Sequence, residues 1–410
     1  MSNHVNRLIE RKYLLPFILI TSLFFMWGFA RSILDVLNKH FQESLEISIF
    51  QSTMIQATTY VAYALMALPA GIFITRYGYR RGVVLGLLLF GLGALAFIPG
   101  DCLMSYGIFL TALFVIGCGL AVLETAANPY ATELGDSATA ASRLNLAQSF
   151  NGLGCILGPI MVGLFLFGGE GDSSVAWPYA IMGGIVLTVA ILFTRVSLPE
   201  IKIGVQPDHK IEASQSGTLS TIRRLWSSSR FRWGVIALFC YEIAEISINS
   251  LFINYVTADG WMDKVDATLV LSFGALGLFL VARVAGSAIM KYIRAEKVLA
   301  VCAVMTVLGA LLVTLNVGFV SKAGLFMCYA FEAIMFPTIF AITISECGSS
   351  TKIASSFLMM TPLGGAVGTS LMGWVGGVTS MATSFVVPTI GYAIVLLYAL
   401  LFTSRLNKTK

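Results

Sequence analysis

Residues 120–130 read Leu-Ala-Val-Leu-Glu-Thr-Ala-Ala-Asn-Pro-Tyr, which places the carboxylate Glu124 and the proline Pro129 inside an apolar run long enough to cross a bilayer. A charged side chain at the centre of a membrane helix costs roughly 2.5–3.5 kcal/mol on insertion scales. Such a residue is therefore expected to face a cavity and to have a function. We interpret much of the remaining chain as a frame that presents Glu124 and a few other polar groups to a shared central space.

The composition is that of a polytopic membrane protein. Of the 410 residues, 57% are hydrophobic and only 11% are charged, whereas a soluble domain is about 25% charged. The apolar runs are continuous rather than alternating, which predicts helices and not barrel strands. The seven cysteines show no metal-ligand spacing, and we expect no disulfide framework.

A membrane-spanning helix needs about 20 apolar residues, and the sequence predicts twelve such spans. They are 13–38, 48–74, 82–99, 104–130, 143–168, 176–195, 232–257, 268–290, 298–317, 323–345, 354–376 and 384–404. With both termini in the cytoplasm, 21 of the 26 Lys and Arg residues fall on the cytoplasmic side and three fall outside. This asymmetry supports both the number of spans and the orientation.

The chain divides into two related halves. A polar stretch separates them, so the predicted domains are 1–198, a cytoplasmic linker 199–230, and 231–410. Span four carries Glu124 and Pro129, and span ten carries Glu332 and Pro337 at the same spacing of five. Two parallel six-helix repeats with a site at the midplane between them are typical of a secondary transporter.

The loop between spans two and three has a second signature. Residues 71–81, Gly-Ile-Phe-Ile-Thr-Arg-Tyr-Gly-Tyr-Arg-Arg, resemble the Gly-x-x-x-Asp-Arg-x-Gly-Arg-Arg loop of the major facilitator superfamily, with Thr75 in place of the usual Asp. Its arginines are expected to bind carbonyls at helix ends and to help close an inward gate, or alternatively only to set the topology. The predicted gate residues are Arg76, Arg80, Arg81 and Arg283.

Four further stretches together resemble one branch of that superfamily, the fucose/proton symporters and the related glucose/galactose transporters. They are Phe-Phe-Met-Trp-Gly at 24–28 with Asp35; residues 123–130 with Arg-Leu-Asn-Leu-Ala-Gln-Ser-Phe-Asn at 143–151; Phe-Cys-Tyr at 239–241 with Ala-Glu at 244–245; and Pro-Thr-Ile-Phe at 337–340 with Lys352 and Ser-Ser-Phe at 355–357. The resemblance implies that Asp35 and Glu124 couple protons to sugar recognition. Arg31 and Glu245 stand where the fucose symporter has Asn and Gln, so the sugar is left open.

Glu124 has the chemistry that proton coupling requires. Burial destabilises the charged form of a carboxyl, so a buried glutamate can hold a proton at physiological pH. A neutral carboxyl can donate a hydrogen bond to a sugar hydroxyl, whereas an ionised one can only accept. The alternative is a structural carboxyl that is bonded to a neighbouring helix.

Asp35 lies four residues after Arg31, on the same face of a helix. An ion pair between the two would hold Asp35 ionised, which does not suit a proton carrier. Alternatively, Arg31 pairs with Glu245 of the other half and leaves Asp35 free to titrate. The sequence leaves both arrangements open.

The predicted sugar site combines carboxylates, one guanidinium and several amides, because amides both donate to and accept from sugar hydroxyls. Its residues are Arg31, Asp35, Glu124, Asn128, Gln148, Asn151, Glu245 and Asn249. The three histidines lie outside the spans, and no nucleotide-binding loop is present. We therefore expect no metal, no cofactor and no enzymatic activity.

The sequence predicts a secondary active transporter that imports a monosaccharide, fucose-like or another hexose, in symport with protons by alternating access. The alternatives are an uncoupled sugar facilitator or exchanger, a transporter of an amino or acidic sugar, a membrane sensor and a drug exporter. The expected partners are a sugar, protons and the lipid bilayer, with no nucleic acid. We expect a monomer in a bacterial inner membrane with both termini in the cytoplasm.

Overall fold

The protein consists of helices and short connections in the part of the chain that the computed structural model describes, which is residues 9, 11–44, 49–167, 176–195, 218–258, 260–262, 264–345 and 347–405. The helices of the first half are α1 (Leu14–Ser44), α2 (Ile49–Tyr77), α3 (Tyr79–Leu95), α4 (Phe97–Cys102), α5 (Tyr106–Glu133), α6 (Ala140–Phe167) and α7 (Ala176–Arg195). The remaining helices are α8 (Thr218–Ser227), α9 (Ser229–Ala258), α10 (Lys264–Leu269), α11 (Leu276–Ile289), α12 (Ala295–Thr314), α13 (Gly318–Glu332), α14 (Met335–Ile344), α15 (Thr351–Leu358), α16 (Leu363–Val378) and α17 (Val386–Arg405).

The predicted membrane spans coincide with these helices. Within the described residues, nine segments are long and apolar enough to cross a membrane. The other three predicted spans fall on α6, on α7 and on the pair α15 and α16. A π-helical turn, Val270–Ala275, joins α10 to α11. The expectation of an all-helical membrane protein is confirmed.

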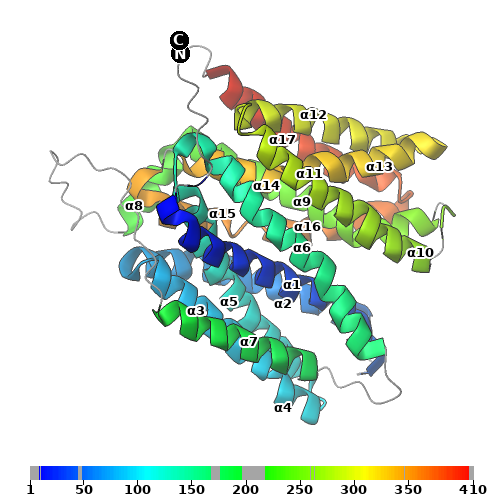
Figure 1. Ribbon diagram of the computed structural model, residues 1–410. Helices are drawn as coiled ribbons and strands as arrows, with labels where there is room; N and C mark the ends of the chain where they lie inside the picture. The colour runs from blue at the N-terminus through cyan, green and yellow to red at the C-terminus, as the bar shows by residue number, and fades with distance from the viewer. Residues whose placement is uncertain are drawn as a thin grey trace.

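The helices form two groups that meet along a few of their members (Figure 1). In the first group α6 packs on α1, and α5 packs on α2 and α3; in the second group α9 packs on α16 and α17, and α12 packs on α13. The groups meet where α6 contacts α11 and α14, and where α15 contacts α2 and α5. The predicted domain boundary at 198 lies outside the described residues, and the described part of the predicted linker contains α8.

Two prolines free backbone carbonyls that other helices then bind. Pro129 and Pro337 lack an N–H, so the carbonyls of Thr125 and Ala333 lose their helical donors four residues on. Ser355 Oγ donates to the Thr125 carbonyl at 3.2 Å. Arg283 Nε donates to the Ala333 carbonyl at 2.7 Å, at the point where α13 ends and α14 begins. Buried polar groups in a membrane protein must find such partners internally.

Glycines allow α1 and α6 to approach closely. A Cβ atom added to Gly28 would lie 2.1 Å from the carbonyl oxygen of Asn151, and one added to Gly154 would lie 2.2 Å from that of Phe25. Real Cβ contacts essentially never fall below 3.0 Å. Small residues at helix crossings are how membrane helices pack without a strong hydrophobic driving force between them.

Replacing Gly28 with valine should destabilise the protein by forcing these two backbones apart. We expect a loss of about 1–3 kcal/mol or more, the usual range for overpacking, seen as a lower midpoint of thermal unfolding in detergent. Gly184→Val is the matched control, because Gly184 also lies in a helix and a Cβ there would meet nothing within 4 Å. Equal losses in the two variants would show that the crossing of α1 and α6 is not the cause.

Candidate functional site

Six charged side chains lie well inside the apolar segments of the described chain. They are Arg31 on α1, Glu124 on α5, Glu242 and Glu245 on α9, Arg283 on α11 and Glu332 on α13. Among the described residues, Arg294 and Glu296 form an ion pair at 3.7 Å, and none of the six takes part in one within 4.0 Å. Four carboxyls thus share two guanidinium groups, so full ionisation would leave uncompensated negative charge in a low-dielectric environment.

Glu124 is held by one side chain from another helix and by one from its own helix. Its side chain is 5% exposed, and its carboxyl interacts with the side chains of Tyr63 on α2 and Asn128 one turn on. The Tyr63 hydroxyl also accepts a hydrogen bond from Trp27 Nε1 on α1. The second carboxyl oxygen, Oε2, is buried and has no hydrogen-bond partner among the described residues, so one acceptor remains available to a ligand.

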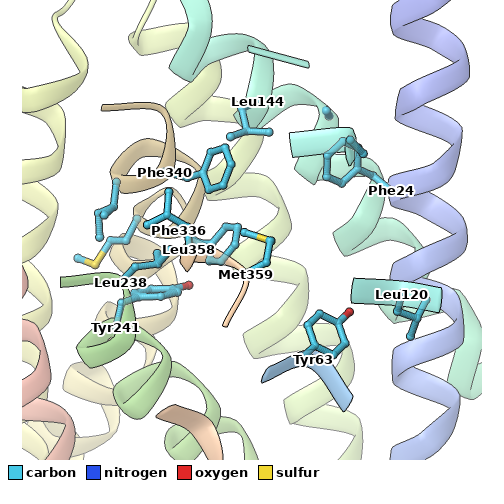
Figure 2. Close-up of a cluster of buried hydrophobic side chains, with 14 of the residues drawn as sticks. Phe24, Tyr63, Leu120, Leu144, Leu238, Tyr241, Phe336, Phe340, Leu358 and Met359 are labelled. Carbon is cyan, nitrogen blue, oxygen red and sulfur yellow. The ribbon is translucent and has the colours of Figure 1, made fainter. Parts of the chain in front are cut away.

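The network continues through the amides into the other half of the molecule. Gln148 Nε2 donates to Asn128 Oδ1 at 3.1 Å, and Asn128 Nδ2 contacts Met359 Sδ at 3.3 Å. Met359 follows α15 in the second group of helices. Figure 2 shows Met359 between Tyr63 on one side and Tyr241 on the other. Three of the predicted sugar-site residues, Glu124, Asn128 and Gln148, therefore form one connected cluster.

Arg31 and Glu245 lie on the more accessible side of this cluster, since both are partly exposed. The guanidinium carbon of Arg31 lies 5.5 Å from the centre of the Trp27 ring, a cation–π contact. Glu245 and Glu242 act electrostatically on Arg31, and Asn249 Nδ2 donates to Glu245 Oε1 at 3.5 Å. The side chain of Asp35 lies outside the described residues. Its proton-coupling and sugar-binding roles stay predictions, and its pairing with Arg31 stays one of the two arrangements that the sequence leaves open.

Asn151 uses its amide to join helices in this conformation. Its Nδ2 donates to the carbonyl of Phe24 on α1 at 3.2 Å, beside the close crossing at Gly28. The side chain is also buried. The structure therefore places Asn151 next to the cluster, with one donor already engaged by backbone, and its predicted contact with sugar stays a prediction.

The loop arginines contact one helix end and one ring. Arg80 Nε donates to the Phe193 carbonyl at 3.1 Å, and Nη2 of the same side chain bonds the Thr194 carbonyl, both in the last turn of α7. Arg76 and Arg81 lie over the Tyr77 ring at 5.4 Å and 5.9 Å. Gly78, with φ of 85°, makes the left-handed turn between α2 and α3. The gate function of these residues stays a prediction.

Arg283 bridges the two groups of helices. Besides the Ala333 carbonyl, it binds the carbonyl of Gln148 on α6 through Nη1 at 3.1 Å. Its guanidinium carbon lies 4.4 Å from the centre of the Phe279 ring. Lys352 Nζ lies over the Tyr79 ring, 4.5 Å from its centre.

Among the described residues, the hydrogen bonds between the groups involve the chain from Thr125 to Gln148, on either side of the junction of α5 and α6. Ser142 and Ser287 exchange bonds, with Ser142 Oγ donating to the Ser287 carbonyl at 2.5 Å and Ser287 Oγ to that of Ser142 at 2.8 Å. Asn145 Nδ2 donates to Thr338 Oγ1 at 3.2 Å. Within the described residues, the two groups are thus hydrogen-bonded at the α5–α6 junction.

Sequence reasoning missed Tyr63 and Met359. A tyrosine inside a span needs a partner for its hydroxyl, which was a usable signal, but the partner Glu124 lies on another helix. Met359 lies in the break between α15 and α16, and only the packing of α15 against α5 brings it to Asn128. Among the described residues, no group of three or more His, Cys, Asp or Glu side chains is placed to hold a metal.

The sequence is similar to those of known membrane transporters. Residues 20–361 match the Major Facilitator Superfamily. The chain belongs to this superfamily. Major facilitator proteins with related sequences include the L-fucose-proton symporter of Escherichia coli strain K12, 33% identical over 95% of this chain and 93% of that protein. The glucose/galactose transporter of Brucella abortus is 31% identical over 97% of this chain and 96% of that protein.

Solved structures agree with this placement. A crystal structure described as the fucose-proton symporter in the outward conformation is 34% identical, with a TM-score of 0.85, covering 95% of this chain and 99% of that one. A proton:xylose symporter at 14% identity, with a TM-score of 0.73, shares the fold. The predicted major facilitator fold, and the resemblance to the fucose and glucose/galactose branch, are confirmed. The matched proteins are transporters and not enzymes.

Proposed function

We propose that this protein imports a monosaccharide together with protons, by alternating access between its two groups of helices. The observation that carries the proposal is Glu124, a buried carboxyl with no cation within 4.0 Å among the described residues and one unpartnered oxygen. It is connected to an indole, a phenol and two amides, the groups suited to hold a sugar. The functions of the relatives, fucose-proton symport and glucose/galactose transport, support the same conclusion.

The hydrogen bonds of the cluster link protonation to sugar binding. When Glu124 carries a proton, its carboxyl can donate to a sugar hydroxyl while its other oxygen accepts from Tyr63 or Asn128. When the proton leaves, the carboxylate only accepts, and it competes for the same donors. Sugar is therefore held more tightly by the protonated form, and release of the proton favours release of the sugar.

The hydrogen bonds at the α5–α6 junction represent the closed inner gate of an outward-facing state. The predicted cytoplasmic ends of the helices lie at this junction, and the structurally similar fucose symporter was captured in the outward conformation. Opening toward the cytoplasm requires these bonds to break, including those of Ser142 with Ser287 and of Arg283 with Gln148. Arg80 keeps the ends of α3 and α7 together within one half during this movement.

A neutral hexose suits the site better than an acidic sugar. The described site already contains four carboxyls and two guanidinium groups, so a further carboxylate from the substrate would add to the excess of negative charge. The positive charge of Arg31 already interacts electrostatically with Glu242 and Glu245. Buried carboxyls without cationic partners are costly inside a membrane, and an uncoupled facilitator does not need them for transport.

The protein acts as a monomer in a bacterial inner membrane, with both termini in the cytoplasm. The orientation rests on the distribution of Lys and Arg, 21 on one side and three on the other. One chain supplies both groups of helices that line the site.

The proposal is tested by uptake into liposomes that contain the purified protein. Radiolabelled L-fucose, D-galactose, D-glucose, D-glucosamine and D-glucuronate are supplied with and without an inward proton gradient, while a pH electrode follows the outer solution. We expect one neutral hexose to accumulate only with the gradient, and the outer solution to become more alkaline as that sugar is added. Equal uptake with and without the gradient would instead establish an uncoupled facilitator.

A further inference from the structure

Glu332 is a second buried carboxyl, in the half that does not contain Glu124. Its side chain is 0% exposed. The hydroxyl of Tyr392, on α17, donates a hydrogen bond to its Oε2. Its Oε1 is buried and has no hydrogen-bond partner among the described residues. Among the described residues, the Tyr392 hydroxyl is thus the hydrogen-bond donor to this carboxyl.

The groups around Glu332 do not neutralise a negative charge there. Glu245 and Arg283 act electrostatically on it, and the remaining titratable neighbours are Tyr241, Tyr329 and Cys328. Arg283 is the one cation of this set. Its hydrogen bonds go to the carbonyls of Ala333 and Gln148 and not to a carboxyl.

Glu332 also occupies the position in the second half that Glu124 occupies in the first. Each glutamate stands five residues before a proline inside an apolar segment. Each has one oxygen near a tyrosine hydroxyl and a second oxygen without a partner. A buried carboxyl in such surroundings is neutral when the neighbouring cation is engaged elsewhere, because its ionised form would be neither hydrated nor paired.

We propose that Glu332 holds a second transported proton besides that of Glu124, so that the second half of the protein also contributes a proton-carrying carboxyl. This inference rests on the proposed function. On release, the O–H bond of the Glu332 carboxyl breaks, the proton passes to water that enters past the partly exposed Glu245, and the electron pair stays on the carboxylate.

Arg283 connects this event to the gate. Once Glu332 is ionised, the guanidinium has an anion as an alternative to the neutral carbonyl of Gln148, and a carboxylate adds the attraction of opposite charges to the hydrogen bond. Movement of Arg283 toward Glu332 would remove a bond between the two groups of helices. Loss of the second proton thus favours opening at the α5–α6 junction.

The test compares Glu332→Gln with the unmodified protein in liposomes, using whichever of L-fucose, D-galactose and D-glucose the unmodified protein accumulates. The number of protons transported per sugar molecule is measured under a known pH gradient. Since one pH unit is worth about tenfold in accumulation for each coupled proton, we expect the variant to accumulate about tenfold less sugar for each unit of gradient. Exchange of internal for external sugar, which needs no net proton movement, should persist. The control is Glu296→Gln, at a glutamate in the first turn of α12 that pairs with Arg294.

An unchanged proton-to-sugar ratio in Glu332→Gln would overturn the inference while leaving the proposed function intact. No proton movement in the unmodified protein would overturn both. If Glu332→Gln does not fold, Tyr392→Phe replaces it. Because the Tyr392 hydroxyl stabilises the ionised carboxyl, its loss should move the half-maximal point of proton-driven uptake to higher pH. A purely structural role would lower the unfolding midpoint without moving that pH, and this result would also count against the inference.

Discussion

Glu124→Gln should abolish proton-driven accumulation of sugar while sugar exchange continues. The amide has nearly the same shape as the carboxyl and can still hydrogen-bond to Tyr63 and Asn128, but it cannot bind or release a proton. With a gradient of about two pH units, each coupled proton supports accumulation of about 100-fold. Glu124 is the carboxyl through which protonation acts on the sugar, so its loss uncouples the sugar from the gradient even if Glu332 still binds a proton. The variant should equilibrate sugar at about equal concentrations inside and outside, which an uptake assay in liposomes measures directly.

The same variant should remove the dependence of sugar affinity on pH. In the unmodified protein, affinity should fall as pH rises, because the neutral carboxyl donates to the sugar and the carboxylate does not. In Glu124→Gln the amide donates at every pH, so affinity should be flat. Ligand-induced stabilisation in thermal unfolding, at several pH values, reports this affinity by mass action.

A control on the same helix separates the site from general effects of charge. Glu133 lies at the end of α5 and accepts a hydrogen bond from the Tyr79 hydroxyl at 2.9 Å, away from the cluster. Glu133→Gln should keep gradient-driven accumulation and the pH dependence of affinity. Accumulation by Glu124→Gln that matches the unmodified protein would remove Glu124 from the coupling mechanism.

The sequence could locate the site because charges in an apolar run are rare and conspicuous. Glu124 and Arg31 stand out in this way, and the resemblance placed Asn128 and Gln148 beside them. The contacts could not be predicted, because they depend on the rotation of each helix. Tyr63 reaches Glu124 only because α2 packs on α5, and Asn151 turned out to donate to the backbone of α1.

Arg283 shows a different limit of sequence reasoning. The sequence predicted a role for it in closing the gate. That the guanidinium binds the Ala333 carbonyl follows only from the packing of α11 beside the break between α13 and α14. The second bond, to Gln148, then joins the sugar cluster and the gate through one residue.

Arg283→Met should shift the protein away from the closed state at the α5–α6 junction. Methionine keeps contact with Phe279 but leaves the Ala333 carbonyl without a donor and removes the bond to Gln148. Hydrogen bonds to charged groups contribute about 1.5–3 kcal/mol each, and about 1.4 kcal/mol changes a two-state ratio tenfold. The ratio of closed to open protein should therefore fall by about tenfold or more, and the unfolding midpoint should also fall.

Spin labels at Ser137 and Tyr292 measure this shift, because the two exposed positions lie beside the junction on opposite groups of helices. Pulsed electron–electron double resonance should show one short distance between the labels in the unmodified protein. In Arg283→Met it should also show a population with a longer distance. Arg232→Met, at an exposed arginine of α9, should leave the distances unchanged. If Arg283→Met lowers only the unfolding midpoint and keeps the short distance, then Arg283 stabilises the break in the helix without controlling the gate. A longer distance together with retained folding would show that the Arg283 guanidinium links the gate, the proline break and the sugar cluster.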